Sequence, residues 1–359
     1  MIRPLRALSL AVLLLAIAAG PAAARIAYAI PKGTNATGFR IITAADDGSA
    51  AVALGVRGYD PCISPDGTRV AYVAGAISEG TSLRIRTIAT GAELVSPVVY
   101  GSASANQLAW SPDGSRLLVP TDSSDREGYV TGQGLTIVDA ATGTGTVVAP
   151  PKGNEVTGYS WAPSGAQFAY AMGRWGGRLY GETLRIANAD GTPVRSLGRG
   201  SNPLWGPARI AFQRHTSERW HGTTVYHAQL WLADPLGVAA TVQLTHYPAT
   251  GMVYGPWAGY WSPDGTTLYG GIGGEDYSQP GRVAVATGRF TPYRGTDGSA
   301  LQDAFPAGIS ADGQTLLVRT DVMMGDEKLK LMPVGGGALR PFLAGREVLE
   351  LSVPPSWQP

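Results

Sequence analysis

Short apolar segments recur along the chain in pairs, and a polar turn separates the two members of each pair. In the best-preserved copies the first segment ends on a large apolar residue, the turn reads Ser-Pro-Asp-Gly, and the second segment has alternating or consecutive apolar positions. This pattern predicts two antiparallel strands joined by a tight hairpin. The copies are CISPDGTRVAYVA from Cys62, AWSPDGSRLLVP from Ala109, SWAPSGAQFAYA from Ser160, YWSPDGTTLYGG from Tyr260 and GISADGQTLLVR from Gly308, with a decayed copy, LWGPARIAFQR, from Leu204.

The turn residues explain the hairpin. Proline presets φ at the first turn position, aspartate hydrogen-bonds to main-chain amides of its own turn, and glycine accepts a positive φ. We therefore interpret these aspartates as turn formers and not as catalytic acids. The large residues before the turns hold a fixed place in the repeat, so we expect them to pack between units and not to stack on a ligand. They include Trp110, Trp161, Trp205, Trp261 and Trp357.

Two further strands are predicted after the hairpins, which gives four strands to a unit. The third strands are LRIRTI from Leu83, LTIVD from Leu135, TLRIAN from Thr183, AQLWLAD from Ala228, RVAVAT from Arg282 and KLKLMPV from Lys328. The fourth are VVAP from Val147, PVRSL from Pro193, TVQLT from Thr241 and RPFLAG from Arg340. No amphipathic helix is predicted after residue 24.

The spacing of the turns predicts a β-propeller. The proline or alanine of each turn falls at 65, 112, 163, 207, 263 and 311, with differences of 47, 51, 44, 56 and 48. Four strands in about 48 residues is typical of a propeller blade. Counting first strands, including one near Trp357, predicts an all-β, single β-propeller of seven four-stranded blades. The turn phrase alone occurs six times, so six blades is the alternative.

The two ends of the repeat region complement each other. Residues 25–29 match residues 69–73, a second strand without its first, and residues 355–359 match residues 108–112, a first strand without its second. We therefore predict that the C-terminal strand pairs with the N-terminal blade. This pairing would close the ring and remove the unpaired edges of an open array.

The composition agrees with this fold. The 49 Gly and 26 Pro residues make up 75 of 359, while 44% of residues are hydrophobic, which suits strands and turns better than a helical bundle or a disordered chain. The formal net charge of +1 argues against a nucleic-acid partner. Cys62 is the only cysteine, so no internal disulfide is possible, and we expect its thiol to be buried and inert.

Residues 1–24 have the layout of a secretory signal peptide. Arg3 and Arg6 precede an apolar run over 7–19, and alanines at 22–24 offer a cleavage site. An uncleaved membrane anchor is the alternative, although the run is shorter than the roughly 20 residues of a span. Cleavage would leave residues 25–359 as one propeller domain and lower the net charge from +1 by 2 to −1. We expect a secreted or periplasmic monomer with no membrane span after processing.

The WSPDG phrase, followed by an apolar strand and a short Arg-Ile strand, resembles the repeats of TolB-like propellers, which are relatives of WD-repeat proteins. The resemblance covers nearly the whole chain after residue 24 and implies the propeller fold. Members serve as binding platforms, accessory domains and enzymes, so the fold implies no single function. The best-known member has six blades and a separate N-terminal α/β domain for which this chain leaves no room. We therefore do not expect this chain to have the envelope role of that member.

Loops on one face of the ring are predicted to carry the function. The hairpin turns and the third-to-fourth connections are short, whereas the connections over 120–133, 172–181, 214–227, 245–256 and 272–281 are longer and belong to the opposite face. Arginine, aromatic and histidine residues gather on several of them, as in binding patches. The predicted binding residues are Arg174, Trp175, Arg178, Tyr180, Arg214, His215, Arg219, Trp220, His221, His227 and Tyr254.

No metal, cofactor or catalytic residue is predicted. His215, His221 and His227 are evenly spaced by six, which is not a zinc-ligand pattern, and residues 122–127 lack the full loop pattern for calcium. No G-x-S-x-G motif is present. We expect an exported, non-catalytic platform that binds a protein, peptide or glycan. The alternative is a propeller enzyme of the lactonase or lyase type that acts on a small molecule at the central channel.

Overall fold

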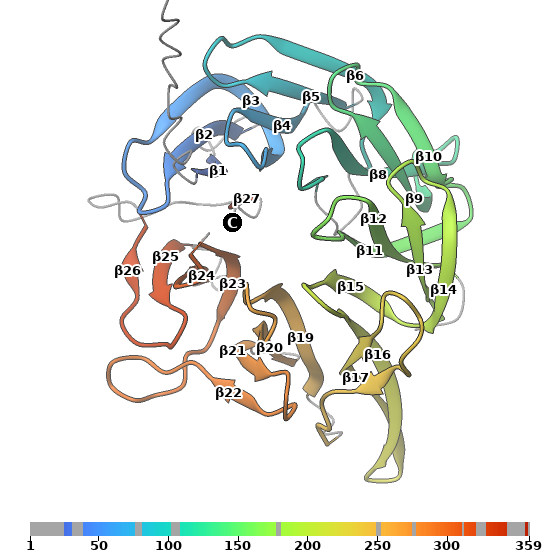
Figure 1. Ribbon diagram of the computed structural model, residues 1–359, viewed down its shortest axis with the longest axis vertical. Helices are drawn as coiled ribbons and strands as arrows, with labels where there is room; N and C mark the ends of the chain where they lie inside the picture. The colour runs from blue at the N-terminus through green and yellow to red at the C-terminus, as the bar shows by residue number, and fades with distance from the viewer. Residues whose placement is uncertain are drawn as a thin grey trace, which may run out of the picture.

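The chain forms a ring of β-sheets around a central axis (Figure 1). The computed structural model describes residues 25–30, 39–75, 81–101, 108–176, 181–248, 253–274, 278–310, 312–320, 328–342 and 356–357. All the secondary-structure elements in these ranges are β-strands. These ranges contain no helix that is long and apolar enough to cross a bilayer. The predicted signal peptide over 1–24 lies outside the described residues.

Five of the sheets have four antiparallel strands each, in chain order from one edge of the sheet to the other. They are β7 (Ala109–Trp110), β8 (Arg116–Ser124), β9 (Val130–Asp139) and β10 (Gly145–Ala149); β11 (Asn154–Trp161), β12 (Gln167–Arg174), β13 (Thr183–Asn188) and β14 (Pro193–Arg199); β15 (Ser201–Trp205), β16 (Ile210–Trp220), β17 (Thr223–Ala233) and β18 (Val242–Gln243); β19 (Val253–Trp261), β20 (Thr267–Gly274), β21 (Ser278–Ala284) and β22 (Phe290–Pro292); and β23 (Ala304–Ile309), β24 (Thr315–Thr320), β25 (Lys328–Pro333) and β26 (Arg340–Pro341). The predicted hairpins and third strands are confirmed in these sheets.

The sixth sheet is wide and occupies the place where two blades were predicted. Its order is β27-β1-β2-β3-β4-β5-β6. These strands are β1 (Arg25–Ile30), β2 (Phe39–Ala45), β3 (Val52–Ile63), β4 (Arg69–Ala74), β5 (Ser82–Thr87), β6 (Glu93–Val99) and β27 (Ser356–Trp357).

Strand β3 joins the two halves of the wide sheet. Its first part pairs with β2, as Arg57 with Arg40, and its last part pairs with β4, as Ile63 with Val70. Counted as hydrogen-bonded sheets, the ring has six blades, and the prediction of seven four-stranded blades is wrong. The repeat spacing missed this because it locates turns and not the continuity of a strand between them.

The two ends of the described chain meet in the wide sheet. β27 pairs antiparallel with β1, with Trp357 opposite Ile26 and Ser356 opposite Ala27. The register is the one found inside the repeat, where Ile63 lies opposite Val70. Main-chain pairing therefore closes the ring at this point (Figure 1).

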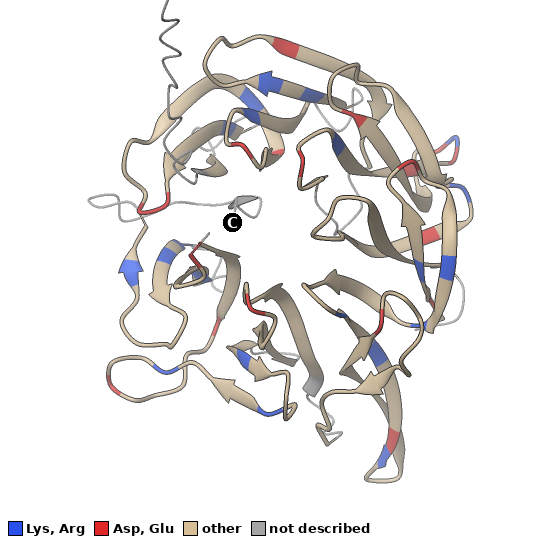
Figure 2. Cartoon of the chain, in the orientation of Figure 1, with Lys and Arg blue, Asp and Glu red and all other residues tan. Residues whose placement is uncertain are grey.

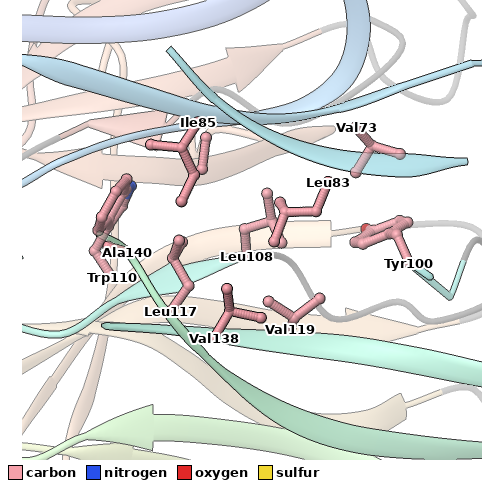
Figure 3. Close-up of a cluster of buried hydrophobic side chains, with 11 residues drawn as sticks. Val73, Leu83, Ile85, Tyr100, Leu108, Trp110, Leu117, Val119, Val138 and Ala140 are labelled. Atoms are coloured by element: carbon pink, nitrogen blue, oxygen red, sulfur yellow. The ribbon is translucent and has the colours of Figure 1, made fainter. Parts of the chain in front are cut away.

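The core lies between neighbouring sheets and not in one central mass. Figure 3 shows the cluster between the wide sheet and the β7–β10 sheet, where Val73 and Leu83 face Leu117 and Val119. Leu83, Leu117 and Val119 are 0% exposed. Each sheet buries apolar side chains against both of its neighbours, because alternate strand residues point to opposite faces.

The hairpin turns repeat the same hydrogen bonds. Ser64 Oγ donates to Asp66 Oδ1 at 2.6 Å, the Thr68 N–H donates to the same oxygen at 3.0 Å, and the Arg69 N–H donates to Ser64 Oγ at 2.9 Å. The same pattern recurs in the turns of Ser111 and Asp113, Ser262 and Asp264, and Ser310 and Asp312. The turn aspartates are confirmed as turn formers.

Candidate functional site

A two-stranded arm projects from the ring where a long loop was predicted. β16 and β17 pair without interruption from Ile210 opposite Ala233 to Trp220 opposite Thr223. The flanking strands stop earlier, because β15 pairs with β16 no further than Gln213 and β18 pairs only with residues 231–232 of β17. The outer part of this hairpin therefore extends beyond its sheet (Figure 1).

The arm ends in a two-residue turn. His221 has φ +47° and Gly222 has φ +84°, which is the pair of positive φ values of a type I′ hairpin turn. The prediction of a loop over 214–227 is wrong. The signal that could have shown a hairpin is His-Gly followed by the β-prone run Thr-Thr-Val-Tyr.

The strand register divides the predicted binding residues between two faces of the arm. Residues opposite each other in an antiparallel pair share a face. Thr216 lies opposite His227, so Arg214, Glu218 and Trp220 share the face of His227. His215, Arg219 and Tyr226 belong to the other face, and His221 lies in the turn. The predicted set is therefore not one continuous patch.

Of the two histidines at the base of the arm, His227 is buried and His215 is half-buried. His227 is 1% exposed; its Nε2 lies 3.2 Å from Thr216 Oγ1 and 3.7 Å from Glu218 Oε1. Its Nδ1 has no hydrogen-bond partner among the described residues. Burial, together with the charge of His227, lowers the pKa of His215 to about 4. His215 is therefore neutral at physiological pH.

Large aromatic side chains are exposed along the outer part of the arm. Trp220 is 38% exposed and Tyr226 is 52% exposed. The indole of Trp220 makes an edge contact with the ring of His221, with centroids 4.3 Å apart. This contact orders two aromatic groups at the tip, on a strand pair that holds them away from the ring.

The remaining predicted residues lie on neighbouring elements. Arg174 ends β12 and is exposed. The next residue, Trp175, is 38% exposed, and its main-chain N–H donates to the Gly153 main-chain oxygen at 3.1 Å. Tyr254 belongs to β19, and its side chain lies outside the described residues, as do Arg178 and Tyr180. β12 and β16 are second strands of adjacent sheets, so Trp175 and the arm leave the same face of the ring.

Arg214 is held at the base of the arm by two aromatic rings. Its guanidinium carbon lies 4.3 Å from the ring centroid of Trp231 and 5.4 Å from that of Phe212. Its Nε donates to the Arg199 main-chain oxygen at 3.0 Å. Burial and the charge of Arg199 lower the pKa of Arg214, but a guanidinium stays protonated at any ordinary pH.

A second place of interest, which sequence reasoning missed, lies in the wide sheet. Asp60 has φ +48° at an irregularity of the β3–β4 ladder, and its carboxylate accepts a hydrogen bond from the Tyr100 hydroxyl. Burial raises the pKa of Asp60, although the hydrogen bond acts in the opposite direction. Asn202, also five residues before its turn proline, has φ +49°. Asp and Asn before proline at this place were the available signal.

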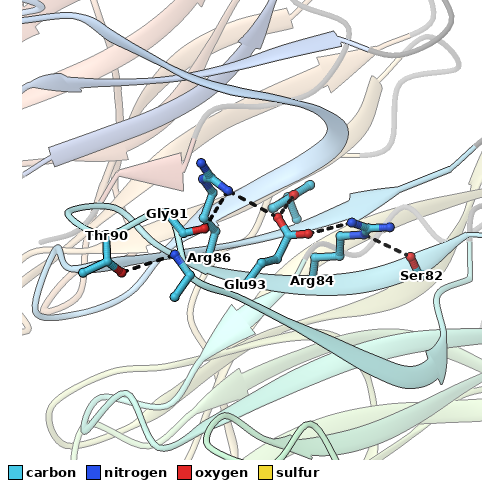
Figure 4. Close-up of polar contacts among 8 residues, drawn as sticks. Ser82, Arg84, Arg86, Thr90, Gly91 and Glu93 are labelled. Atoms are coloured by element: carbon cyan, nitrogen blue, oxygen red, sulfur yellow. Dashed lines mark hydrogen bonds and ion pairs between the residues drawn. The ribbon is translucent and has the colours of Figure 1, made fainter.

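The carboxylate of Glu93 has a structural role. Glu93 on β6 lies 2.6 Å from Arg84 and 3.7 Å from Arg86 on the neighbouring β5, and it also accepts a hydrogen bond from Tyr72 (Figure 4). These partners keep the pKa of Glu93 low although burial would raise it. Because its oxygens are already engaged, Glu93 joins strands and offers little to a ligand.

No group of three or more His, Cys, Asp or Glu side chains that could hold a metal occurs in the part of the chain that the structure describes. Within residues 122–127, Asp125 Oδ1 accepts the N–H groups of Glu127 and Tyr129 at 3.1 and 2.8 Å. This carboxylate therefore forms the turn between β8 and β9.

The described fold is similar to solved β-propellers. TolB from Acinetobacter baumannii is 17% identical with a TM-score of 0.54, over 95% of this chain and 68% of that chain. The β-propeller domain of the Trilobed protease from Pyrococcus furiosus is 14% identical with a TM-score of 0.60, over 90% and 95%. An oligogalacturonate lyase in complex with manganese is 15% identical with a TM-score of 0.55, over 88% and 84%.

At these identities the similarity shows the β-propeller fold, and the relationship to WD-repeat proteins stays a prediction. No protein-family model matches the chain, and no curated protein matches it. The neighbours include TolB, a protease domain and a lyase, so the fold by itself does not choose between binding and catalysis.

Proposed function

We propose that this protein is an exported, non-catalytic binding platform that recognises a protein, peptide or glycan through the arm of β16 and β17. The observation that carries the proposal is the arm itself, a hairpin that extends beyond its sheet and exposes Trp220 on one of its faces and Tyr226 on the other. Aromatic side chains are the usual anchors of binding surfaces, because they bury a large area at a small cost in side-chain entropy. Trp175 on the same face of the ring extends the surface.

The rigidity of the arm supports this role. Eleven consecutive pairs connect its strands, and the positive-φ turn fixes its tip. At the base, Gln229 is 1% exposed; it donates to the Tyr247 oxygen at 2.7 Å and accepts from Thr245 Oγ1 at 2.8 Å. A prearranged surface loses less conformational entropy on binding than a flexible loop does.

The test is affinity capture from envelope extracts of the host with the purified chain as bait. A partner that binds the wild-type chain should be lost from the double variant Trp220→Ala, Tyr226→Ala, and weakened by Trp175→Ala. The matched control is Val238→Ala, which alters an 86% exposed side chain away from the arm. Unchanged capture by the double variant, with an unchanged unfolding midpoint, would contradict the proposal.

Export rests on the predicted signal peptide over residues 1–24. Mass spectrometry of the protein from host envelope and culture fractions should find an N-terminus at Arg25. Recovery of the intact chain from the cytoplasm alone would contradict export.

Asp60 favours a second candidate function, an enzyme of the lactonase or lyase type. A half-buried carboxyl with a raised pKa, hydrogen-bonded to a tyrosine, has the properties of an acid–base group. Turnover of a lactone panel or of acidic oligosaccharides by the wild-type chain, and its loss in Asp60→Asn, would support this function. Equal rates for the two proteins would dismiss Asp60 as a catalytic residue.

A further inference from the structure

Arg214 is a partly buried cation without a counter-ion in the described residues. Arg214 takes no part in an ion pair between described residues, unlike Arg84 and Arg86, which pair with Glu93. The charge that acts on its guanidinium is the like charge of Arg199, which lowers the pKa of Arg214. A partly desolvated cation next to another cation is unfavourable, and an anion between them would relieve both.

Among the described residues, the two terminal nitrogens of Arg214 make no hydrogen bond. The guanidinium carbon lies over the rings of Trp231 and Phe212, and its one hydrogen bond within the described part of the chain is from Nε to the Arg199 oxygen. The two terminal nitrogens carry the donors that form paired hydrogen bonds to a carboxylate. The two rings and the Nε hydrogen bond hold the side chain in place, so little rotamer entropy is lost when a carboxylate binds.

The main chain beside Arg214 suits an extended partner. β15 pairs with β16 up to Gln213, the residue just before Arg214, and the edge of β16 continues from there to Trp220. A strand edge that outlasts its neighbour is a site for strand addition by a peptide. Arg199, the last residue of β14 on the adjacent sheet, adds positive charge next to Arg214, and Figure 2 shows basic positions along β14.

We propose that Arg214 is the specificity-determining residue of an acidic-peptide site, in which a Glu or Asp carboxylate of an extended segment pairs with its guanidinium at the base of the arm. This inference rests on the proposed function, because it names the chemical class of the ligand for the same arm. It assigns the exposed aromatic residues to general contact and Arg214 to selection for negative charge.

The experiment uses the purified chain and three probes in isothermal titration calorimetry: acetylated triglutamate, triglutamine of the same length, and trigalacturonate. The wild-type chain should bind triglutamate and give no measurable heat with triglutamine. Arg214→Gln should weaken triglutamate binding by about tenfold or more, since a charged hydrogen-bonded pair is lost. Arg214→Lys, which keeps the charge but loses the fork, should also weaken it by several-fold.

Arg195→Gln is the matched control, since it removes an exposed positive charge of the adjacent sheet and leaves Arg214 unchanged. Its affinity should stay within about twofold of wild type. Equal losses in Arg195→Gln and Arg214→Gln would overturn the inference, because the attraction would then be general. So would a wild-type chain that binds no triglutamate at millimolar concentration, or one that binds only trigalacturonate.

Two further measurements separate a failure of the inference about Arg214 from a failure of the proposed function: the thermal unfolding midpoint and the capture of a partner. If Arg214→Gln lowers the thermal unfolding midpoint, the comparison of Arg214→Lys with wild type decides the inference. A second outcome is that the wild-type chain binds no triglutamate while the double variant Trp220→Ala, Tyr226→Ala still abolishes partner capture. That result would contradict the inference about Arg214 and would support the binding platform. Loss of both results would remove the proposed function as well.

Discussion

The indole Nε1 of Trp110 donates a 2.9 Å hydrogen bond to the main-chain oxygen of Cys62 in the preceding sheet. The bond recurs around the ring, from Trp161 to Ala109 at 3.1 Å and from Trp261 to Leu204 at 2.9 Å. Each of these three tryptophans therefore joins its sheet to the one before it, and the prediction that they pack between units is confirmed for Trp110, Trp161 and Trp261. The side chain of Trp357 lies outside the described residues.

Replacing Trp110 by Phe should destabilise the protein by about 1–2 kcal/mol. The ring would still fill its place between the sheets, but the buried oxygen of Cys62 would lose its donor. Urea unfolding of the wild type and variant measures the difference. Trp220→Phe, at the exposed tip of the arm, is the control and should change stability by less than about 0.5 kcal/mol.

Gly255→Ala should loosen the base of the arm. Gly255 has φ +101°, and a β-carbon there would lie 2.1 Å from the Ala228 oxygen on β17. Both strain and overlap oppose the change, so we expect a loss of at least about 2 kcal/mol and faster amide hydrogen exchange in β17. Gly273→Ala, which meets nothing within 4 Å, should leave both measurements near wild type.

The pKa of His215 predicts a pH dependence of stability. Because burial lowers this pKa from 6.5 to about 4, the unfolded chain binds more protons than the folded chain between these values. Stability that is present above pH 6.5 is therefore lost as the pH falls towards 4. Since the imidazole of His215 is partly solvated, we expect this residue to contribute about 1–2 kcal/mol to the loss of stability on acidification.

Thermal unfolding of wild type and His215→Gln over this pH window checks the effect. The variant should show a shallower loss of its unfolding midpoint on acidification. Parallel curves for the two proteins would show that His215 does not carry the dependence.

Asp60→Asn should raise the unfolding midpoint at neutral pH. The raised pKa shows that the folded state disfavours the charged carboxylate, whereas the amide oxygen of Asn can accept the same hydrogen bond from Tyr100. Asn also tolerates the positive φ, as Asn202 does at +49°. The gain should disappear below the ordinary pKa of Asp, where both side chains are neutral. A variant less stable than wild type at neutral pH would contradict this account.

Removal of residues 350–359 should open the ring. The deletion takes away β27, which pairs with β1 through Ile26 and Ala27. We expect a lower unfolding midpoint and faster hydrogen exchange in β1, because its inner edge would lose main-chain partners. A protected β1 in the truncated chain would show that closure does not depend on this strand.

The sequence by itself determined the hairpin turns, the strands that flank them and the closing register of the ring. These features depend on local chemistry: Pro, Asp and Gly shape each turn, and the two-residue period of a strand gives the pairing between residues 25–29 and the C-terminal strand. The same local patterns placed the tryptophans between sheets.

Only the tertiary structure decided the number of sheets and the form of the candidate site. The continuity of β3, the extension of β16 and β17 into an arm, and the contact between Asp60 and Tyr100, 40 residues apart, depend on neighbours distant in sequence. The same holds for the environment of Arg214, which consists of two rings and a main-chain oxygen from three places in the chain. A local pattern cannot show such contacts, because burial and missing counter-ions arise only when the sheets pack together.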